Sequence, residues 1–296
     1  MVETNPEGKV DMGNSEFTGG RPSDGVAKPD LELRVVQSLT KRLPRIRGMG
    51  RLMQLAGRVY FRKPRPRLIS NVLGFEMVVD PDCGLQECLL LAPQLYDRRE
   101  INYMLSRLRP GDCFVDVGAH IGLYALLASR RIGPAGRVLA VEACQETHSI
   151  LNDNLRLNGI ANVQVVNIAV SDSRGKATLQ IAPENAGRNS LLQIANAARS
   201  VEVPCEPLGD LLEANGVTSV AGMKIDVEGM EYRILKHFFE NAAPTLFPRF
   251  IILEHLEAFR AVAGGDATEV VPRHGYRLAM RTSMNCIYER LDRLPT

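Results

Sequence analysis

Apolar runs and helical periods alternate along the chain from Phe114 onward. Runs typical of buried strands, FVDVGA, RVLAVEA and VQVVNIAV, begin at Phe114, Arg137 and Val163. Between them, amphipathic patterns predict helices over residues 121–131 and 145–158. This order of strand, helix and strand predicts an α/β fold, in which a parallel sheet carries helices on both faces.

The second half of the chain continues the alternation after an interruption. The strand-like runs KATLQIA and SVEVPCEPL flank a polar loop over residues 183–200. The strand GMKIDVEG, a helix over residues 230–239 and the strand RFIILEHL follow. The last two runs, HGYRLAMRT and MNCIYERL, are separated by a short turn. We expect them to be antiparallel, because a parallel pair needs a long crossover.

The N-terminal part of the chain has a different character. Residues 1–30 are rich in Gly, Pro, Ser, Asn and acidic residues and lack the apolar core of a signal peptide, which predicts a disordered tail. Residues 31–68 contain helix-like patches, in which Leu52, Leu55 and Val59 fall at helical spacing with arginines between them, and this predicts a basic helical extension over residues 31–73. The α/β domain is then expected over residues 74–296.

The charge of the chain is unevenly distributed. The formal net charge is +2, but residues 41–75 hold ten Lys or Arg and no Asp or Glu, which leaves −8 on the rest. The basic residues are explained either as the solvated face of helices or as a contact of residues 41–67 with an anionic membrane surface or acidic substrate. Nucleic acid is disfavoured as a partner, because aromatic residues are rarely interleaved and the main domain is acidic.

Cysteine usage and hydropathy favour a cytoplasmic protein. The six cysteines are scattered without a CxxC pair, and the five histidines show no ligand spacing. This is typical of free thiols in a reducing compartment and argues against a zinc site. No run of 18 or more apolar residues predicts a transmembrane helix.

A glycine turn after the first strand is the strongest candidate for a ligand site. Its pattern is D-x-G-x-x-x-G, with Asp116, Gly118 and Gly122. Ligands of open α/β sheets bind at the carboxyl ends of strands, and glycines allow a tight turn there. A dinucleotide fingerprint fails, because His120 and Leu123 occupy its second and third glycine positions. Close packing of helix on strand is the other explanation of the spacing.

An acidic residue ends the next strand. Glu142 follows Gly122 by twenty residues, where a carboxylate can accept hydrogen bonds from both hydroxyls of a ribose. The turn and this acid together predict a ligand that contains an adenosine-like nucleoside but no diphosphate.

Three segments carry a resemblance to a known family. VDVGAHIGLYALLAS, VLAVEA and MKIDVEGMEYRILK resemble successive motifs of class I S-adenosyl-L-methionine-dependent methyltransferases of the FkbM type, and LRPGD and IILEH also fit. The resemblance covers roughly residues 74–291. It implies a Rossmann-like, seven-stranded, mostly parallel sheet with an antiparallel last strand, helices on both faces, and S-adenosylmethionine as cofactor.

The resemblance also implies which residues bind this cofactor. The first loop would comprise Asp116, Gly118, Ala119, His120 and Gly122, although many relatives have Asn where this chain has His120. Glu142 would hold the ribose. The residues implied beside the adenine are Asn167, Ser171 and Asp172, for which a plain turn is the alternative.

The KIDVEG segment carries the candidate chemistry. Strand alternation places Lys224, Asp226 and Glu228 on one side, where buried charges are costly unless they are paired or functional. Asp226 can attract the cationic cofactor, and an ion pair with Lys224 is the alternative for either acid. Glu254 and His255 end the neighbouring predicted strand. The candidate bases are Glu228 and Asp226, then His255, then His120. Asp226, Glu228 and Glu254 could also hold magnesium.

We therefore expect a methyltransferase domain that acts on a hydroxyl of a small molecule, sugar or natural-product precursor. The oxygen acceptor is implied by the resemblance alone. The rivals are a nicotinamide-dependent oxidoreductase and a non-catalytic module that binds a nucleoside on the same fold. The oligomeric state is not predicted.

Overall fold

The structure is a computed structural model that describes residues 26–40, 66–81, 83, 86–182, 189–192, 199–255 and 264–291. Most of the predicted N-terminal tail, of the basic segment 41–67 and of the loop 183–200 lies outside these residues. None of the helices within them has the length and apolar character needed to cross a membrane.

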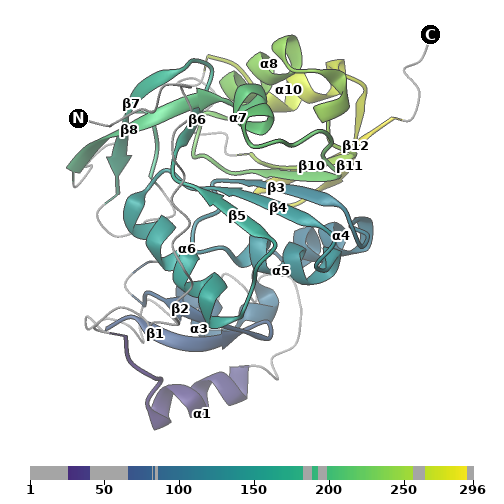
Figure 1. Cartoon of the computed structure of the whole chain (residues 1–296). Coiled ribbons are helices and arrows are strands. Elements are labelled where there is room, and N and C mark those ends of the chain that lie inside the picture. Colours follow the sequence, from purple (N-terminus) through teal and green to yellow (C-terminus); the bar gives the residue numbers. More distant parts are fainter. Residues whose placement is uncertain are drawn as a thin grey trace.

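A seven-stranded sheet forms the centre of the molecule (Figure 1). Its strand order is β11-β12-β10-β9-β3-β4-β5. The bounds are β3 Cys113–Val117, β4 Arg137–Val141, β5 Val163–Val166, β9 Gly222–Ile225, β10 Phe250–Glu254, β11 Tyr276–Arg281 and β12 Asn285–Arg290. β12 is antiparallel to both its neighbours, while β10, β9, β3, β4 and β5 pair in parallel. The predicted Rossmann-like sheet with a reversed last strand is confirmed.

Helices cover both faces of this sheet, as the alternation predicts. In Figure 1, one face carries α4 Arg98–Arg107, α5 Leu123–Ile132 and α6 Gln145–Leu157, and the other carries α7 Leu208–Ala214, α8 Glu231–Asn241 and α10 Ala267–Arg273. Each face has its own apolar core, because successive residues of a strand point to opposite sides. Phe114 and Ile252 belong to the first core, whereas Val115 and Ile251 belong to the second.

Two smaller sheets flank the main one. The hairpin of β1 Leu68–Val72 and β2 Phe75–Val79 packs on α6, whose Asn154 side chain accepts a 2.7 Å hydrogen bond from the amide of Val78. The second sheet has the order β6-β8-β7 and comprises β6 Ala169–Ser171, β7 Gly175–Ile181 and β8 Arg199–Pro207. The hairpin joins residues on either side of the predicted boundary at residue 73.

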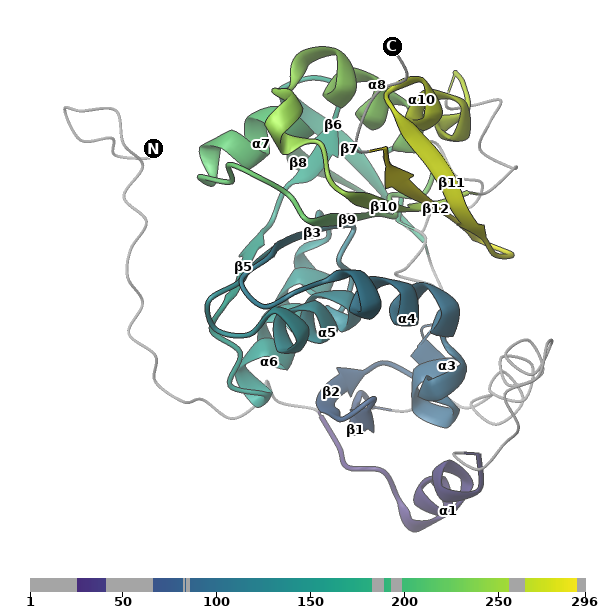
Figure 2. The same cartoon turned by 90° about the vertical axis from the view of Figure 1, so that its right-hand side faces the viewer.

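The described N-terminal helix attaches to the hairpin and α3 rather than to the main sheet. Figure 2 shows α1 Leu31–Thr40 beyond the hairpin, on the side away from the seven-stranded sheet. The Gln37 side chain of α1 donates hydrogen bonds of 2.9 Å to the Ser70 hydroxyl and to the carbonyl of Leu90. Three short helical segments complete the described chain: α3 Gln86–Leu91, η1 Pro93–Leu95 and η3 Pro244–Leu246.

Two predicted element boundaries are wrong. The run VQVVNIAV is not one strand, because β5 ends at Val166 and β6 begins at Ala169 in another sheet. The helix expected from residue 121 begins at Leu123, because His120 and Gly122 have left-handed backbones, with φ of 52° and 90°, that cannot continue a right-handed helix.

Candidate functional site

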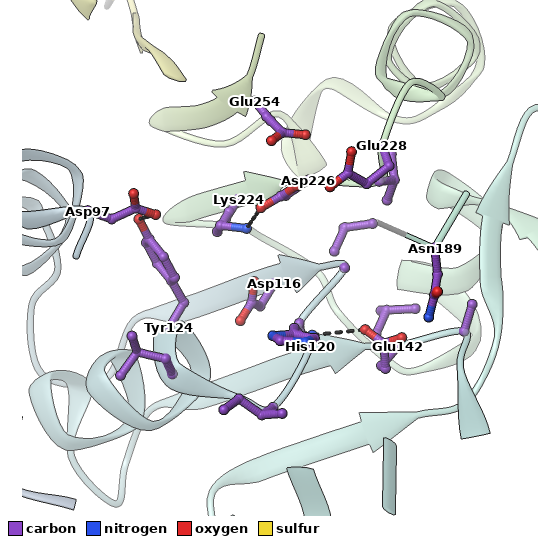
Figure 3. Close-up of a pocket in the computed structure, with 18 of the residues that line it drawn as sticks. Asp97, Asp116, His120, Tyr124, Glu142, Asn189, Lys224, Asp226, Glu228 and Glu254 are labelled. Atoms are coloured by element: carbon purple, nitrogen blue, oxygen red, sulfur yellow. Dashed lines mark hydrogen bonds and ion pairs between the residues drawn. The ribbon is translucent and has the colours of Figure 1, made fainter. Parts of the chain in front are cut away.

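A pocket lies at the carboxyl ends of β3, β4, β9 and β10. Its walls come from the turn after β3, the end of β4, the turn after β9, the segment 88–97 and the loop 283–285. Figure 3 labels ten of its polar side chains, with Asp97 and Tyr124 on one side of Lys224 and with Glu142 and Asn189 on the other. This is the edge at which ligands of open α/β sheets bind.

The glycines of the first turn have structural reasons to be glycine. Gly118 has a φ of 76°, and a Cβ there would stand 1.8 Å from the carbonyl oxygen of Asp226. Gly122 is the N-cap residue of α5, and a Cβ there would meet Leu151 at 3.0 Å. Gly118 lines the pocket and Gly122 does not. The bare backbone at Gly118 therefore serves first to bring the ends of β3 and β9 together.

Glu142 is held in place by backbone amides. Its Oε2 accepts a 2.8 Å hydrogen bond from the amide of His120, and its Oε1 accepts a 2.9 Å bond from the amide of Cys144. Burial raises the pKa of Glu142 to about 7, although both amides lower it. Each oxygen accepts one bond from these amides and can still accept another from a ligand.

The residues predicted beside the adenine flank the pocket without lining it. Asn167 donates hydrogen bonds of 2.8 Å and 3.1 Å to the carbonyls of Glu142 and Ala143, so it fixes the end of β4. The Ser171 hydroxyl donates a 3.2 Å bond to the Asp172 carboxylate. The wall of this part of the pocket is formed by apolar neighbours, namely Ile168, Ala169, Val170, Leu179 and Leu191.

A buried lysine lies among the carboxyl groups of β3 and β9. Lys224 Nζ pairs with Asp226 Oδ2 at 2.6 Å, so the ion pair that the sequence left open as an alternative is present. Burial alone would lower the pKa of Lys224, but the charges of Asp226 and Asp116 outweigh it and raise the pKa above its usual value. Asp116 is 1% exposed, and neither oxygen accepts a hydrogen bond of normal geometry from the described residues. Burial raises the pKa of Asp116 to about 6.

Glu254 adds a further carboxyl group to this cluster. Burial, and then the charges of Asp226 and Glu228, raise the pKa of Glu254 well above its usual value. Lys224 opposes the effect of burial on Asp226 and holds its pKa below the usual value. The side chains of Asp226 and Glu254 are hydrogen-bonded to each other, and this bond lowers the pKa of Asp226 and raises that of Glu254. Oxygens of Asp226, Glu228 and Glu254 lie within 4.8 Å of one another.

The turn after β9 departs from the predicted alternation. β9 ends at Ile225, and Val227 lines the pocket together with Asp226 and Glu228. Glu228 has a left-handed backbone with a φ of 52°. The carboxylate of Glu231, which the sequence analysis did not single out, accepts bonds of 2.9 Å from the amides of Val227 and Gly229. Those two bonds stabilise the turn that carries Glu228.

The two candidate histidines differ in position. His255 follows β10 but does not line the pocket, and its Nδ1 lies 3.8 Å from Asp266. His120 lines the pocket, and burial lowers its pKa to about 4, so the ring is neutral. The Nε2 of His120 lies 3.4 Å from Nε2 of Gln86.

Asp97 and Tyr124 line the pocket although the sequence analysis did not predict them. The Tyr124 hydroxyl donates a 3.1 Å hydrogen bond to Asp97 Oδ2. Burial, and then the charge of Glu100, raise the pKa of Asp97 to about 7. In the sequence, an Asp ahead of a helical pattern is typical of a helix cap, so the signal was present but indicated a different role.

Comparison with known proteins identifies the family. The family model described as the methyltransferase FkbM domain matches residues 116–278, more than half of the chain. The chain is 30% identical over 198 residues to the 31-O-demethyl-FK506 methyltransferase FkbM of Streptomyces tacrolimicus, over 57% of this chain and 74% of that protein. It is 26% identical over 164 residues to the methyltransferase sdnD of Sordaria araneosa. That match covers 45% of this chain and 63% of sdnD, so the chain spans less than two thirds of the length of that relative.

Solved structures with a similar fold are more distant in sequence. The precorrin-6y C5,15-methyltransferase of Geobacter metallireducens is 16% identical with a TM-score of 0.41, over 67% of this chain and 89% of that one. A S-adenosylmethionine-dependent O-methyltransferase of Thermotoga maritima is 12% identical with a TM-score of 0.41, over 67% of each chain. The match to the family model confirms the resemblance seen in the sequence: the chain belongs to the FkbM family of S-adenosylmethionine-dependent methyltransferases.

Proposed function

We propose that this protein transfers the methyl group of S-adenosylmethionine to a hydroxyl group of a small-molecule or carbohydrate acceptor. The observation that carries the proposal is the composition of one pocket. Its lining includes six carboxyl groups, from Asp97, Asp116, Glu142, Asp226, Glu228 and Glu254, and one lysine, Lys224. Such an excess of buried and half-buried carboxyl groups favours a cationic ligand.

The residues of the pocket fit this cofactor. S-adenosylmethionine carries a sulfonium and an ammonium group, and Asp116 is a buried carboxyl group that accepts no hydrogen bond of normal geometry within the described part of the chain. Glu142 retains a free acceptor position on each oxygen for the two ribose hydroxyls. The apolar wall that includes Leu179 and Leu191 suits an adenine ring. When bound, the cofactor supplies an electrophilic methyl group.

The proton of the acceptor hydroxyl must be removed during transfer, because an alcohol is a weak nucleophile at neutral pH. Asp226 is engaged by Lys224 and by Glu254 and has a lowered pKa, which makes it a poor base. Glu228 lies on the adjoining turn, held by the contacts of Glu231. Glu228 is accordingly the proton acceptor, and Asp226 supplies negative charge to the cationic site. His255 has no part in this scheme.

The test is transfer of labelled methyl from S-adenosylmethionine to a panel of hydroxyl compounds and sugars, with identification of the product by mass spectrometry. Glu228→Gln is expected to abolish most of the label, and Glu213→Gln, an exposed position on α7, is the matched control. A product labelled on nitrogen would overturn the hydroxyl acceptor and leave the methyltransferase assignment intact. Binding of NAD in place of S-adenosylmethionine in a titration would favour the oxidoreductase rival, and binding without transfer to any acceptor would favour the non-catalytic module.

Magnesium is a separate proposal for the same carboxyl groups. The proximity of Asp226, Glu228 and Glu254 favours it, whereas the ion pair with Lys224 already neutralises part of their charge. Comparing the transfer rate in chelator with the rate in added Mg²⁺ tests it. The contact of residues 41–67 with an anionic surface stays a prediction, since residues 41–65 lie outside the described chain.

A further inference from the structure

Asp97 occupies the N-cap position of α4 but does not cap the helix. Asp is among the preferred N-cap residues because its carboxylate accepts a hydrogen bond from an amide of the first turn. The Asp97 side chain makes no such bond and instead accepts the hydroxyl proton of Tyr124 at 3.1 Å. Asp266, at the N-cap of α10, does cap its helix and accepts a 2.9 Å bond from the amide of Thr268.

The backbone of Asp97 is also unusual. Its φ of 38° and ψ of 35° lie in the left-handed region, which L residues other than glycine rarely adopt. Four non-glycine residues of the described chain have a positive φ, and three of them, Asp97, His120 and Glu228, line this pocket. Strain of this kind persists where the surrounding structure imposes it, and it concentrates at ligand sites. Asp97 therefore faces the pocket at the cost of both the capping hydrogen bond and an unstrained backbone conformation.

The charges around Asp97 leave room for a cation. Lys224 is close enough to lower the pKa of Asp97, but its ammonium group forms its ion pair with Asp226. Within the described residues, no salt bridge within 4 Å reaches Asp97 or Asp116. Asp116 is 1% exposed, lines the same pocket and accepts no hydrogen bond of normal geometry. Among the described residues, these two carboxyl groups of one pocket therefore form no ion pair of their own, although the charge of Lys224 acts on both.

We propose that Asp97 and Asp116 together bind the α-ammonium group of the methionine part of the cofactor. This rests on the proposed use of S-adenosylmethionine. With the ribose at Glu142, the methionine part must occupy another region of the pocket, and Figure 3 places Asp97 and Tyr124 across Lys224 and Asp116 from Glu142. Asp97 precedes residues 116–278, the part of the chain that matches the family model.

Tyr124 is the positioning residue of this site. Its hydroxyl occupies Oδ2 of Asp97, which leaves Oδ1 to accept a hydrogen bond from a ligand ammonium group. Tyr124 lies in the first turn of α5, directly after the glycine turn, so it links Asp97 to the element that carries the cofactor loop.

Binding of three ligands to the full-length protein, measured by calorimetry, tests the proposal. The ligands are S-adenosylhomocysteine, its analogue with hydrogen in place of the amino group, and 5′-methylthioadenosine, which lacks the amino-acid part. Asp97→Asn is expected to weaken S-adenosylhomocysteine by about 10- to 100-fold, the range of a hydrogen bond to a charged group. The same variant is expected to change the other two affinities by less than about twofold. Tyr124→Phe is expected to show the same selectivity, with the affinity for S-adenosylhomocysteine reduced by about threefold, the lower end of the contribution of one hydrogen bond.

Asp266→Asn is the matched control, since it changes an aspartate at another N-cap that does not line the pocket, and it should leave all three affinities unchanged. Equal weakening of the three ligands by Asp97→Asn would overturn the proposal, because it would show a general distortion of the pocket. Unchanged affinity for S-adenosylhomocysteine with a reduced transfer rate would also overturn it and place Asp97 at the acceptor. If the wild-type protein binds none of the three ligands, the proposed function fails as well; if Asp97→Asn does not fold, Tyr124→Phe decides with the same ligands.

Discussion

The two ends of the central sheet differ in whether their polar side chains have hydrogen-bond partners. At the amino end of β3, the Asp112 carboxylate accepts a 2.8 Å bond from the amide of Arg109 and pairs with Arg249 at 2.5 Å. Nearby, Asn162 donates a 2.7 Å bond to the carbonyl of Gly133. At the carboxyl end of the same strand, Asp116 has no comparable bond.

This difference in hydrogen bonding distinguishes residues that stabilise the fold from residues that bind a ligand. Satisfied polar groups at the amino end contribute to stability in the protein alone. Buried carboxyl groups and left-handed backbones at the carboxyl end cost stability in the protein alone and are explained by binding. Substitutions at the carboxyl end should therefore change binding or transfer, and substitutions at the amino end should change the melting temperature.

The largest effect is expected from Glu228→Gln. Removing the proton acceptor should lower kcat by about 10²- to 10⁴-fold, the usual contribution of general-base catalysis. The affinity for S-adenosylhomocysteine should stay within about twofold of the wild-type value, because Glu228 is assigned to the acceptor. A matching loss of affinity, measured by calorimetry, would instead make Glu228 a cofactor ligand.

Glu142→Gln should affect the nucleoside rather than the methionine part. The carboxylate bonds to the ribose hydroxyls become weaker amide bonds, so affinity should fall by about 10- to 100-fold. S-adenosylhomocysteine and 5′-methylthioadenosine should lose affinity equally, in contrast to the selective loss expected for Asp97→Asn. Selective loss of only one of these ligands would contradict the assignment of Glu142 to the ribose.

How far the sequence predicted this site depends on the range of the contacts. The cofactor turn, Glu142 and Asp226 follow buried strands whose apolar runs are local signals, and they converge in the pocket as expected. The sequence did not predict that β9 ends at Ile225, because the strand is terminated by the Glu231 carboxylate, which lies beyond it and accepts hydrogen bonds from the amides of Val227 and Gly229. Such side-chain bonds to the backbone leave no periodic pattern.

Longer-range contacts account for the remaining errors. Asn167 turns its amide to the carbonyls of Glu142 and Ala143, more than twenty residues earlier, and the chain breaks there between β5 and β6. Asp97 depends on Tyr124, which lies 27 residues away. An aspartate before a helix is locally a normal cap, and only the tertiary structure shows that it faces the pocket.

The pH dependence of binding should be opposite to that of stability. Burial raises the pKa of Asp97 and Glu142 to about 7 and that of Asp116 to about 6, above the unfolded values. These groups bind protons more readily when folded, so the ligand-free protein should become more stable as the pH falls from 8 towards 6. Affinity for S-adenosylhomocysteine should fall over the same range, because the protonated groups no longer attract its ammonium group.

Calorimetry and thermal melting across this pH range check both trends. In Asp97→Asn, the affinity for S-adenosylhomocysteine should change less steeply with pH than in the wild-type protein. The difference in slope should be at most about tenfold in affinity per pH unit, because one titrating group has been removed. Parallel trends of affinity and stability would show that these carboxyl groups serve the fold rather than the ligand.

The smallest effect is expected at the amino end of the sheet, from Asp112→Asn. The variant weakens the bond to the Arg109 amide and the partly exposed ion pair with Arg249, which together contribute about 1 kcal/mol. The melting temperature should fall by about 2–4 °C for a chain of this size. Binding of S-adenosylhomocysteine and the transfer rate should not change, since Asp112 lies at the opposite end of β3 from the pocket. A loss of affinity for S-adenosylhomocysteine without a change in melting temperature would contradict the division between a stabilising end and a ligand-binding end of the sheet. The ion pair of Asp112 with Arg249 would then affect the ligand through the whole length of β3.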